Sequence, residues 1–74
     1  MIAGEHLDIV KSKLESIKTK VSPMDAKEVA KIVGKSKQTI LNYINGGATN
    51  ENLGTNIYLH LKRKIDAREE VLNN

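Results

Sequence analysis

A single glycine, Gly34, divides residues 29–46, VAKIVGKSKQTILNYING, into two stretches that each have helical periodicity. Glycine in a helix interior costs about 1 kcal/mol relative to alanine, so one continuous helix is disfavoured here. A linker would need no strict apolar pattern on either side of the break, and this segment has one on both sides. The pattern therefore predicts two short helices joined by a sharp turn at Gly34.

The stretch before the glycine starts with residues that favour the beginning of a helix. Ser22 can accept hydrogen bonds from the backbone N–H groups of the next turn, and Pro23 suits the first helical position because it has no N–H to leave unpaired. Asp25 is favourable near the positive end of a helix. We therefore expect a helix from about residue 23 to residue 33. Its inward-facing residues are expected to be Met24, Val29, Ala30 and Val33.

The stretch after the glycine is expected to form a second short helix over residues 37–45. Gly34 can adopt a left-handed backbone that ends the first helix, and Ser36 can cap the second. Asn-Gly-Gly at residues 45–47 strongly favours a turn and therefore limits the length of this helix. Two helices joined so closely must pack at a steep angle, and Ala30 is small enough for their closest approach.

Upstream, residues 3–21 contain an apolar stripe whose spacing alternates between four and three. The stripe consists of Ala3, Leu7, Val10, Leu14, Ile17 and Val21. It is roughly 80° wide, closer to a coiled-coil seam than to a broad core-facing surface. We expect an amphipathic helix that docks on its own domain, forms a self-association seam, or does both.

The second half of the chain begins with a glycine- and asparagine-rich stretch, GGATNENLGTN, which predicts a loop over residues 46–56. Apolar residues then alternate with polar ones, as in a short half-buried strand. The alternating residues are Ile57, Leu59 and Leu61. Asp66 with Glu69 three residues later predicts a capping box and a short last helix. The alternative is one uninterrupted helix over residues 56–72.

The length of 74 residues places the chain near the lower limit for a domain that folds alone. It has no cysteine for a disulfide, and its two histidines, His6 and His60, are too far apart to indicate a zinc site, so we expect no metal and no cofactor. Self-association remains as a source of stability, and we expect a homodimer. No apolar stretch approaches the roughly 20 residues of a membrane span, so we expect a cytoplasmic protein without a membrane partner.

Ala30, Gly34 and Ile40 fit the pattern A-x3-G-x5-I. Over residues 26–45 the sequence resembles the DNA-binding helix-turn-helix of Cro-like and Xre-like repressors. It departs from many members in having Lys35 directly after the glycine, where they have an apolar residue. The expected order of loop, strand and short helix that follows is similar to the winged relatives found in excisionases and MerR-type regulators.

The expected fold is mainly α: one small helix-turn-helix domain over residues 1–74, with a short β wing and a short C-terminal helix. Within it we expect the N-terminal amphipathic helix at residues 3–21 and the helix-turn-helix at 22–46. The loop and the wing strand should occupy residues 47–65, and the last helix residues 66–74.

On a helical wheel, one arc of roughly 140° of the helix over residues 37–45 is largely polar, and the apolar side lies opposite. The arc consists of Lys37, Gln38, Leu41, Asn42 and Asn45. A helix with such a face outward fits the major groove of DNA. Gln38 and Asn42 are the best candidates for base contacts, because an amide can pair with N6 and N7 of adenine. Lys37 suits guanine, Leu41 a thymine methyl group, and Asn45 a base or a phosphate.

Phosphate contacts are expected on both sides of this helix, because basic and hydroxyl side chains flank it. The candidates are Lys35, Ser36 and Thr39 at its start and Lys62, Arg63 and Lys64 on the wing. Double-stranded DNA is the expected partner, because two tyrosines are too few to form a stacking platform for single strands.

These features predict a sequence-specific, double-stranded DNA-binding transcriptional regulator, a small repressor of the phage or plasmid type. One alternative is an excisionase-like architectural DNA-binding protein, and another is a protein-interaction module or antirepressor. We do not expect an enzyme, because the sequence has no catalytic serine–histidine or cysteine–histidine arrangement and no glycine-rich phosphate loop. No small-molecule substrate is implied.

Overall fold

The computed structural model describes residues 3–73 of the chain, with side chains from residue 6 to residue 72. Four α-helices and two short helical turns make up this part of the protein, and it contains no strand. The elements are α1 (Ala3–Ile17), the 3-10 turn η1 (Lys18–Lys20), α2 (Pro23–Val33), α3 (Lys37–Asn42), the wide helical turn η2 (Tyr43–Gly47) and α4 (Glu51–Asn73). The mainly α prediction is therefore confirmed for the described residues.

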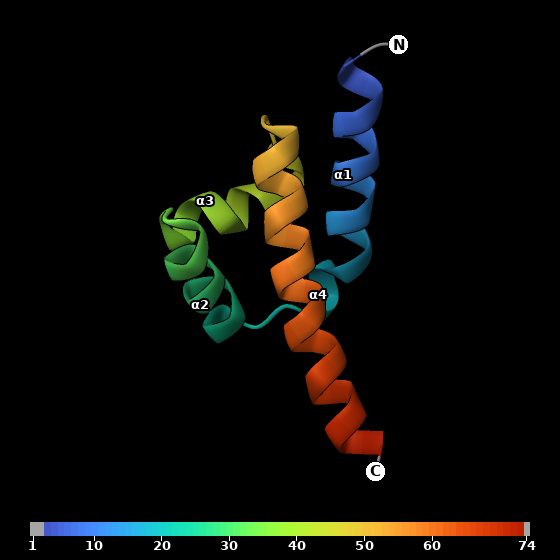
Figure 1. The fold of residues 1–74 in the computed structure, drawn as a ribbon, viewed down its shortest axis with the longest axis vertical. Coiled ribbons are helices and arrows are strands. Elements are labelled where there is room, and N and C mark those ends of the chain that lie inside the picture. The colour runs from blue at the N-terminus through green and yellow to red at the C-terminus, as the bar shows by residue number, and fades with distance from the viewer. Residues whose placement is uncertain (1–2, 74) are drawn as a thin grey trace.

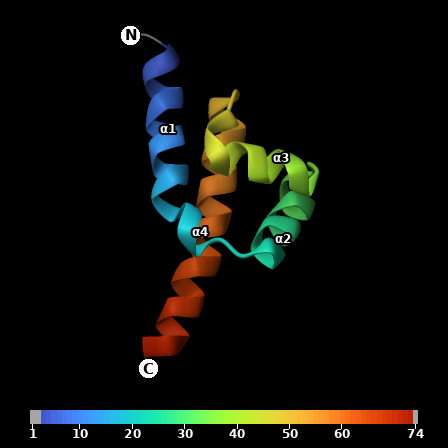
Figure 2. The same cartoon turned by 180° about the vertical axis from the view of Figure 1, so that it is seen from behind.

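The longest two helices, α1 and α4, lie side by side and run in the same direction along the 43 Å long axis (Figure 1). The chain between them returns along the molecule as α2. It then crosses from α2 toward α1 as α3, on one side of α4 (Figure 2). The helix α4 thus contacts α1 along one flank and α2 along the other. The bridge between α2 and α1 consists of α3, which contacts α2, and η2, which contacts α1.

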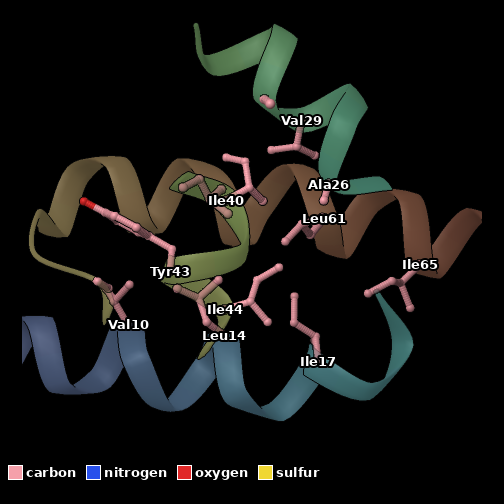
Figure 3. Packing of buried hydrophobic residues seen from close by; sticks show 13 residues of the cluster. Val10, Leu14, Ile17, Ala26, Val29, Ile40, Tyr43, Ile44, Leu61 and Ile65 are labelled. Carbon is pink, nitrogen blue, oxygen red and sulfur yellow. The ribbon is translucent and has the colours of Figure 1, made fainter. Parts of the chain in front are cut away.

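The hydrophobic core lies where these four helices meet (Figure 3). Its largest fully buried side chains are Leu14, Val29, Ile40, Ile57, Leu61 and Ile65. They come from α1, α2, α3 and α4, so each helix contributes to a single core. Burial of such side chains contributes about 1.5–3 kcal/mol each relative to an exposed position, and no disulfide is needed to hold the arrangement.

The stripe on α1 packs on the chain's own core. Val10, Leu14 and Ile17 are buried, and Leu7 and Val21 are partly buried against them, whereas the side chain of Ala3 lies outside the described residues. The first of the two interpretations, docking on the same domain, is what the structure has. The helix is also shorter than predicted, because it ends at Ile17 and tightens into η1.

The caps predicted for α2 are present. The Ser22 hydroxyl accepts a hydrogen bond from the Asp25 amide (3.1 Å), and the Asp25 carboxylate accepts one from the Ser22 amide (3.0 Å). Gly34 ends the helix with a left-handed backbone (φ 72°). The expected inward position of Met24 is wrong: its side chain is 60% exposed, because the first turn places Asp25 and Ala26 toward the core instead.

The predicted wing strand within residues 47–65 is wrong, and so is a separate helix confined to residues 66–74. Glu51–Asn73 is one continuous helix, which corresponds to the alternative considered for residues 56–72 and begins earlier; Asn74 lies outside the described residues. The reason is the spacing of Ile57, Leu61 and Ile65, whose side chains share one buried face. Leu59, which a strand would have buried with them, is 48% exposed. Asp66 lies in the interior of this helix, where it pairs with Lys62 one turn earlier.

The glycine-rich segment that predicted a loop over residues 46–56 contains the first turn of α4. Asn50 caps this helix, because its side-chain oxygen accepts a hydrogen bond from the Leu53 amide (2.9 Å). Gly54 is buried inside the helix, where a Cβ atom would lie 2.6 Å from Cγ1 of Val10. The glycine therefore permits the close approach of α1 and α4, and it does not mark a flexible segment.

Candidate functional site

The orientation of α3 is set by its apolar side. Ile40 is fully buried, and Tyr43 and Ile44 are at least 94% buried against α1 and α4. The backbone keeps helical dihedral angles through Asn45 and departs from them at Gly46 (φ 97°). The α-helix predicted over residues 37–45 is therefore shorter than expected: it ends at Asn42, and residues 43–45 continue it with helical dihedral angles inside the wide turn η2. The side opposite the buried residues faces away from the core.

The exposed side of α3 carries the polar arc that the sequence predicted. Lys37, Gln38 and Asn42 are exposed, whereas Leu41 is half-buried and packs against the core. The Gln38 amide nitrogen donates a hydrogen bond to the side-chain oxygen of Asn42 (2.9 Å), one helical turn away. This bond holds the two amides side by side and leaves the Gln38 oxygen and the Asn42 nitrogen free to pair with another molecule.

At the start of α3, two of the predicted phosphate-binding hydroxyls form the helix cap. The Ser36 hydroxyl accepts a hydrogen bond from the Thr39 amide (3.1 Å) and lies 2.9 Å from the Thr39 hydroxyl. Lys35 is exposed beside them, and its amide donates to the Ala30 carbonyl (2.9 Å) to close the end of α2. The turn between α2 and α3 is thus fixed by backbone bonds, with no apolar side chain at residue 35.

Beyond α3, a tyrosine holds the connection to α4. The Tyr43 hydroxyl accepts a hydrogen bond from the Asn50 amide (3.1 Å) and lies 3.3 Å from the Thr49 hydroxyl. Because the ring of Tyr43 is itself buried, these bonds attach the loop after Gly46 to the core. The end of α3 is therefore held in place as firmly as its start.

The predicted wing cluster of Lys62, Arg63 and Lys64 lies on a helix, where successive side chains diverge by about 100°. Lys62 pairs with Asp66 (2.7 Å), and the hydrogen bond between them raises the pKa of Lys62. Lys64 pairs with Glu28 of α2 (2.9 Å), and Arg63 is exposed. The structure therefore does not gather these three charges into one surface beside α3.

Residues 29–50, which include α3 and the turns on either side, contain no aspartate or glutamate and three lysines: Lys31, Lys35 and Lys37. Outside this segment the chain has nine basic and nine acidic residues, so the whole net charge of +3 resides here. All three lysines are exposed, and within the described residues none of them has an ion-pair partner. Lys31 was missed at the sequence level, although the absence of acidic residues over this segment would have indicated it.

The position of α2 relative to α4 depends on a nearly buried carboxylate. Asp25, 5% exposed, receives both hydrogen bonds of one Arg68 nitrogen (3.1 and 3.2 Å), while the other nitrogen of Arg68 donates to the Lys20 carbonyl (2.8 Å). Burial raises the pKa of Asp25, but the hydrogen bond from the Ser22 amide and the contact with Arg68 outweigh it and hold the pKa below its ordinary value. These bonds anchor the N-terminal end of α2 on α4.

Comparison of the chain with protein-family models, with curated proteins and with solved structures finds no match. Within residues 3–73, no helix is both long enough and apolar enough to cross a lipid bilayer.

Proposed function

We propose that this chain is a sequence-specific, double-stranded DNA-binding transcriptional regulator of the helix-turn-helix type. In this proposal α2, the turn at Gly34 and α3 form the binding unit, and residues 37–45 enter the major groove. The observation that carries it is the pairing of two properties in one short helix. Its apolar side is buried, so its orientation is fixed. Its exposed side carries hydrogen-bonding amides and lies in a segment that has lysines and no acidic residues.

The amide pair supplies the candidate base contacts. Adenine presents N7 as an acceptor and N6 as a donor in the major groove, which matches the donor and acceptor of one side-chain amide. Gln38 and Asn42 are held together by their hydrogen bond, so little side-chain entropy is lost when they meet a base edge. Lys37, exposed one position before Gln38, suits guanine O6 and N7.

The decisive experiment is selection of binding sites from a pool of random duplex DNA, followed by titration of the enriched site. We expect one enriched sequence, and we expect Gln38→Ala to lower the preference for it by about 1–3 kcal/mol, which is roughly 5- to 150-fold. Arg63→Ala is the matched control, because it also truncates an exposed side chain but lies on α4. Binding without any enriched sequence would replace the regulator by an architectural DNA-binding protein.

The number of half-sites in the enriched sequence would test the proposed homodimer. One domain of this size contacts few base pairs, and a twofold dimer would contact two half-sites about one helical turn apart. The stripe on α1 is used by the core, so a dimer would have to form through another surface. A palindromic enriched site is the expected outcome, and a single half-site would argue for a monomer.

A further inference from the structure

Two lysines of α1 and η1 lie at the far end of α3 from the turn at Gly34. Lys11 and Lys18 line a groove of about 290 Å³ between α1 and η2. Its other lining residues are Glu15, Ile44, Asn45 and Gly46. Asn45, the last residue of the polar arc, is thus brought next to two cations that the sequence alone did not connect with it.

The two lysines are available to a partner. Within the described residues neither makes an ion pair, in contrast to Lys20 just beyond, which pairs with Glu69 (2.9 Å). Lys18 is exposed and Lys11 is half-buried. A half-buried lysine with an unpaired ammonium group is well placed to reach an anion outside the protein.

The position of these lysines complements that of Lys35 and Lys37. In Figure 2, α3 runs from the end of α2 toward α1. Lys35 and Lys37 lie at its start, and Lys11 and Lys18 line the groove beside η2 at its other end. The six residues of α3 span about 9 Å at the rise of an α-helix, and η2 continues from its end. The major groove of B-DNA is about 12 Å wide between its phosphate walls. Seated in that groove, α3 would therefore have unpaired lysines at each of its ends to meet the phosphates that flank it.

The groove also contains one carboxylate. Glu15 lies one helical turn from each lysine, and it makes no ion pair with either of them. It offsets one of the two positive charges, so the groove keeps a net charge of +1. Glu15 should therefore weaken the attraction of a phosphate to this end of α3. Removing its charge should strengthen DNA binding, whereas removing the lysine charges should weaken it.

We infer that Lys11 and Lys18 bind backbone phosphates of duplex DNA at the C-terminal end of the recognition helix, the role that the sequence had suggested for Lys62, Arg63 and Lys64. The inference rests on the proposed function. It assigns the second phosphate contact to α1 and η1, because these elements carry unpaired cations beside the end of α3. In this arrangement α4 is a structural support.

The test is the salt dependence of binding to the enriched duplex. Each phosphate neutralised on B-DNA contributes about 0.9 to the slope of log affinity against log salt. For K11Q/K18Q we expect the slope to fall by about 1 to 2 and the affinity to fall about tenfold. The loss should be equal on the enriched and on an unrelated sequence, because phosphates carry no sequence information. For E15Q we expect tighter binding on both sequences.

The control variant is K62Q/R63Q, which removes the same amount of charge from α4 and should leave the slope unchanged. An unchanged slope for K11Q/K18Q, with Gln38→Ala still reducing sequence preference, would overturn the inference and leave the proposed function standing. A loss of slope in K62Q/R63Q equal to that in K11Q/K18Q would also overturn it. A wild-type chain without affinity for duplex DNA would remove the proposed function and this inference with it. Thermal unfolding of each variant shows whether the fold is retained.

Discussion

Two pairs of lysines in the molecule have different surroundings. One pair, Lys35 and Lys37, lies at the start of α3, and the other, Lys62 and Lys64, lies on α4. The two on α4 have carboxylate partners at 2.7 and 2.9 Å, one of them on α2. The two beside α3 lie in a segment without acidic residues and have no ion-pair partner among the described residues. The two lysines on α4 are therefore paired within the protein, whereas the two around α3 are available to bind a partner.

The same contrast holds for the apolar residues of the two regions. α4 contributes three fully buried side chains and is held by α1 and α2 on both flanks. α3 buries Ile40 but leaves Leu41 half-buried on its outer side. We conclude that α4 contributes more to stability than the outer side of α3, which can vary without loss of the fold. Three substitutions test this difference.

The largest effect should come from the core residue of α4. Leu61→Ala removes a fully buried side chain, and we expect it to lower the free energy of unfolding by about 2–5 kcal/mol. In a domain of this size that loss leaves much of the protein unfolded at 25 °C. Leu41→Ala on α3 is the matched control, with an expected loss of about 1 kcal/mol or less. Urea unfolding measures both, and equal losses would contradict the division between the two helices.

An intermediate effect is expected at the arginine that ties α4 to α2. Arg68→Ala removes two hydrogen bonds to Asp25 and one to the Lys20 carbonyl, leaving a nearly buried carboxylate with fewer partners. We expect a loss of about 1–3 kcal/mol in the free energy of unfolding. Arg63→Ala, which removes an unpaired arginine from the same helix, should change it by less than about 0.5 kcal/mol. Thermal or urea unfolding distinguishes the two, and a similar loss in both variants would show that the tie is unimportant.

The smallest effect concerns the acid dependence of stability. Since the pKa of Asp25 is lowered in the folded state, its contribution is fully present above the ordinary value of 3.8. It is lost as the pH falls from that value through the folded-state pKa, because the unfolded chain takes up the proton first. Asp25→Asn should therefore show a shallower decline in stability over this range than the wild type. Parallel declines in urea titrations between pH 5 and pH 2 would contradict the proposed role of Asp25.

The region around Gly34 was predictable because its determinants are local. Ser22 with Asp25 marks the start of α2, Gly34 ends it with a left-handed backbone, and Ser36 caps α3 within a few residues. The spacing of Ile40, Tyr43 and Ile44 also sufficed to orient α3, since a helix of known bounds has only one apolar side.

The start of α4 could not be predicted in the same way, because its determinants are tertiary. Gly54 is a poor helix former on its own, and its place in the helix depends on the approach of Val10 from a segment 44 residues earlier. Ile57, Leu59 and Leu61 satisfy a strand period, and Ile57, Leu61 and Ile65 satisfy a helical one. Only packing against α1 and α2 decides between them.

The sequence predicted the polar arc of the candidate site, but it did not predict which residues lie next to the end of that arc. Gln38, Asn42 and Lys37 follow from the helical wheel of one short segment, whereas the neighbourhood of Asn45 depends on where α1 lies. No sequence pattern connects residue 11 or 18 with residue 45, because that proximity is created by the crossing of α3 toward α1.

The parallel alignment of α1 and α4 has a consequence for how the chain folds. Contacts such as that between Lys20 and Glu69 close a loop of 49 residues. Closing so long a loop costs chain entropy before the contact is formed and can stabilise the fold. An up-and-down bundle avoids this cost, so we expect this topology to fold more slowly than bundles of its size. Residues that shorten the effective loop by ordering the α2–α3 corner early, Gly34 and Ser36 among them, should then influence the folding rate more than the unfolding rate.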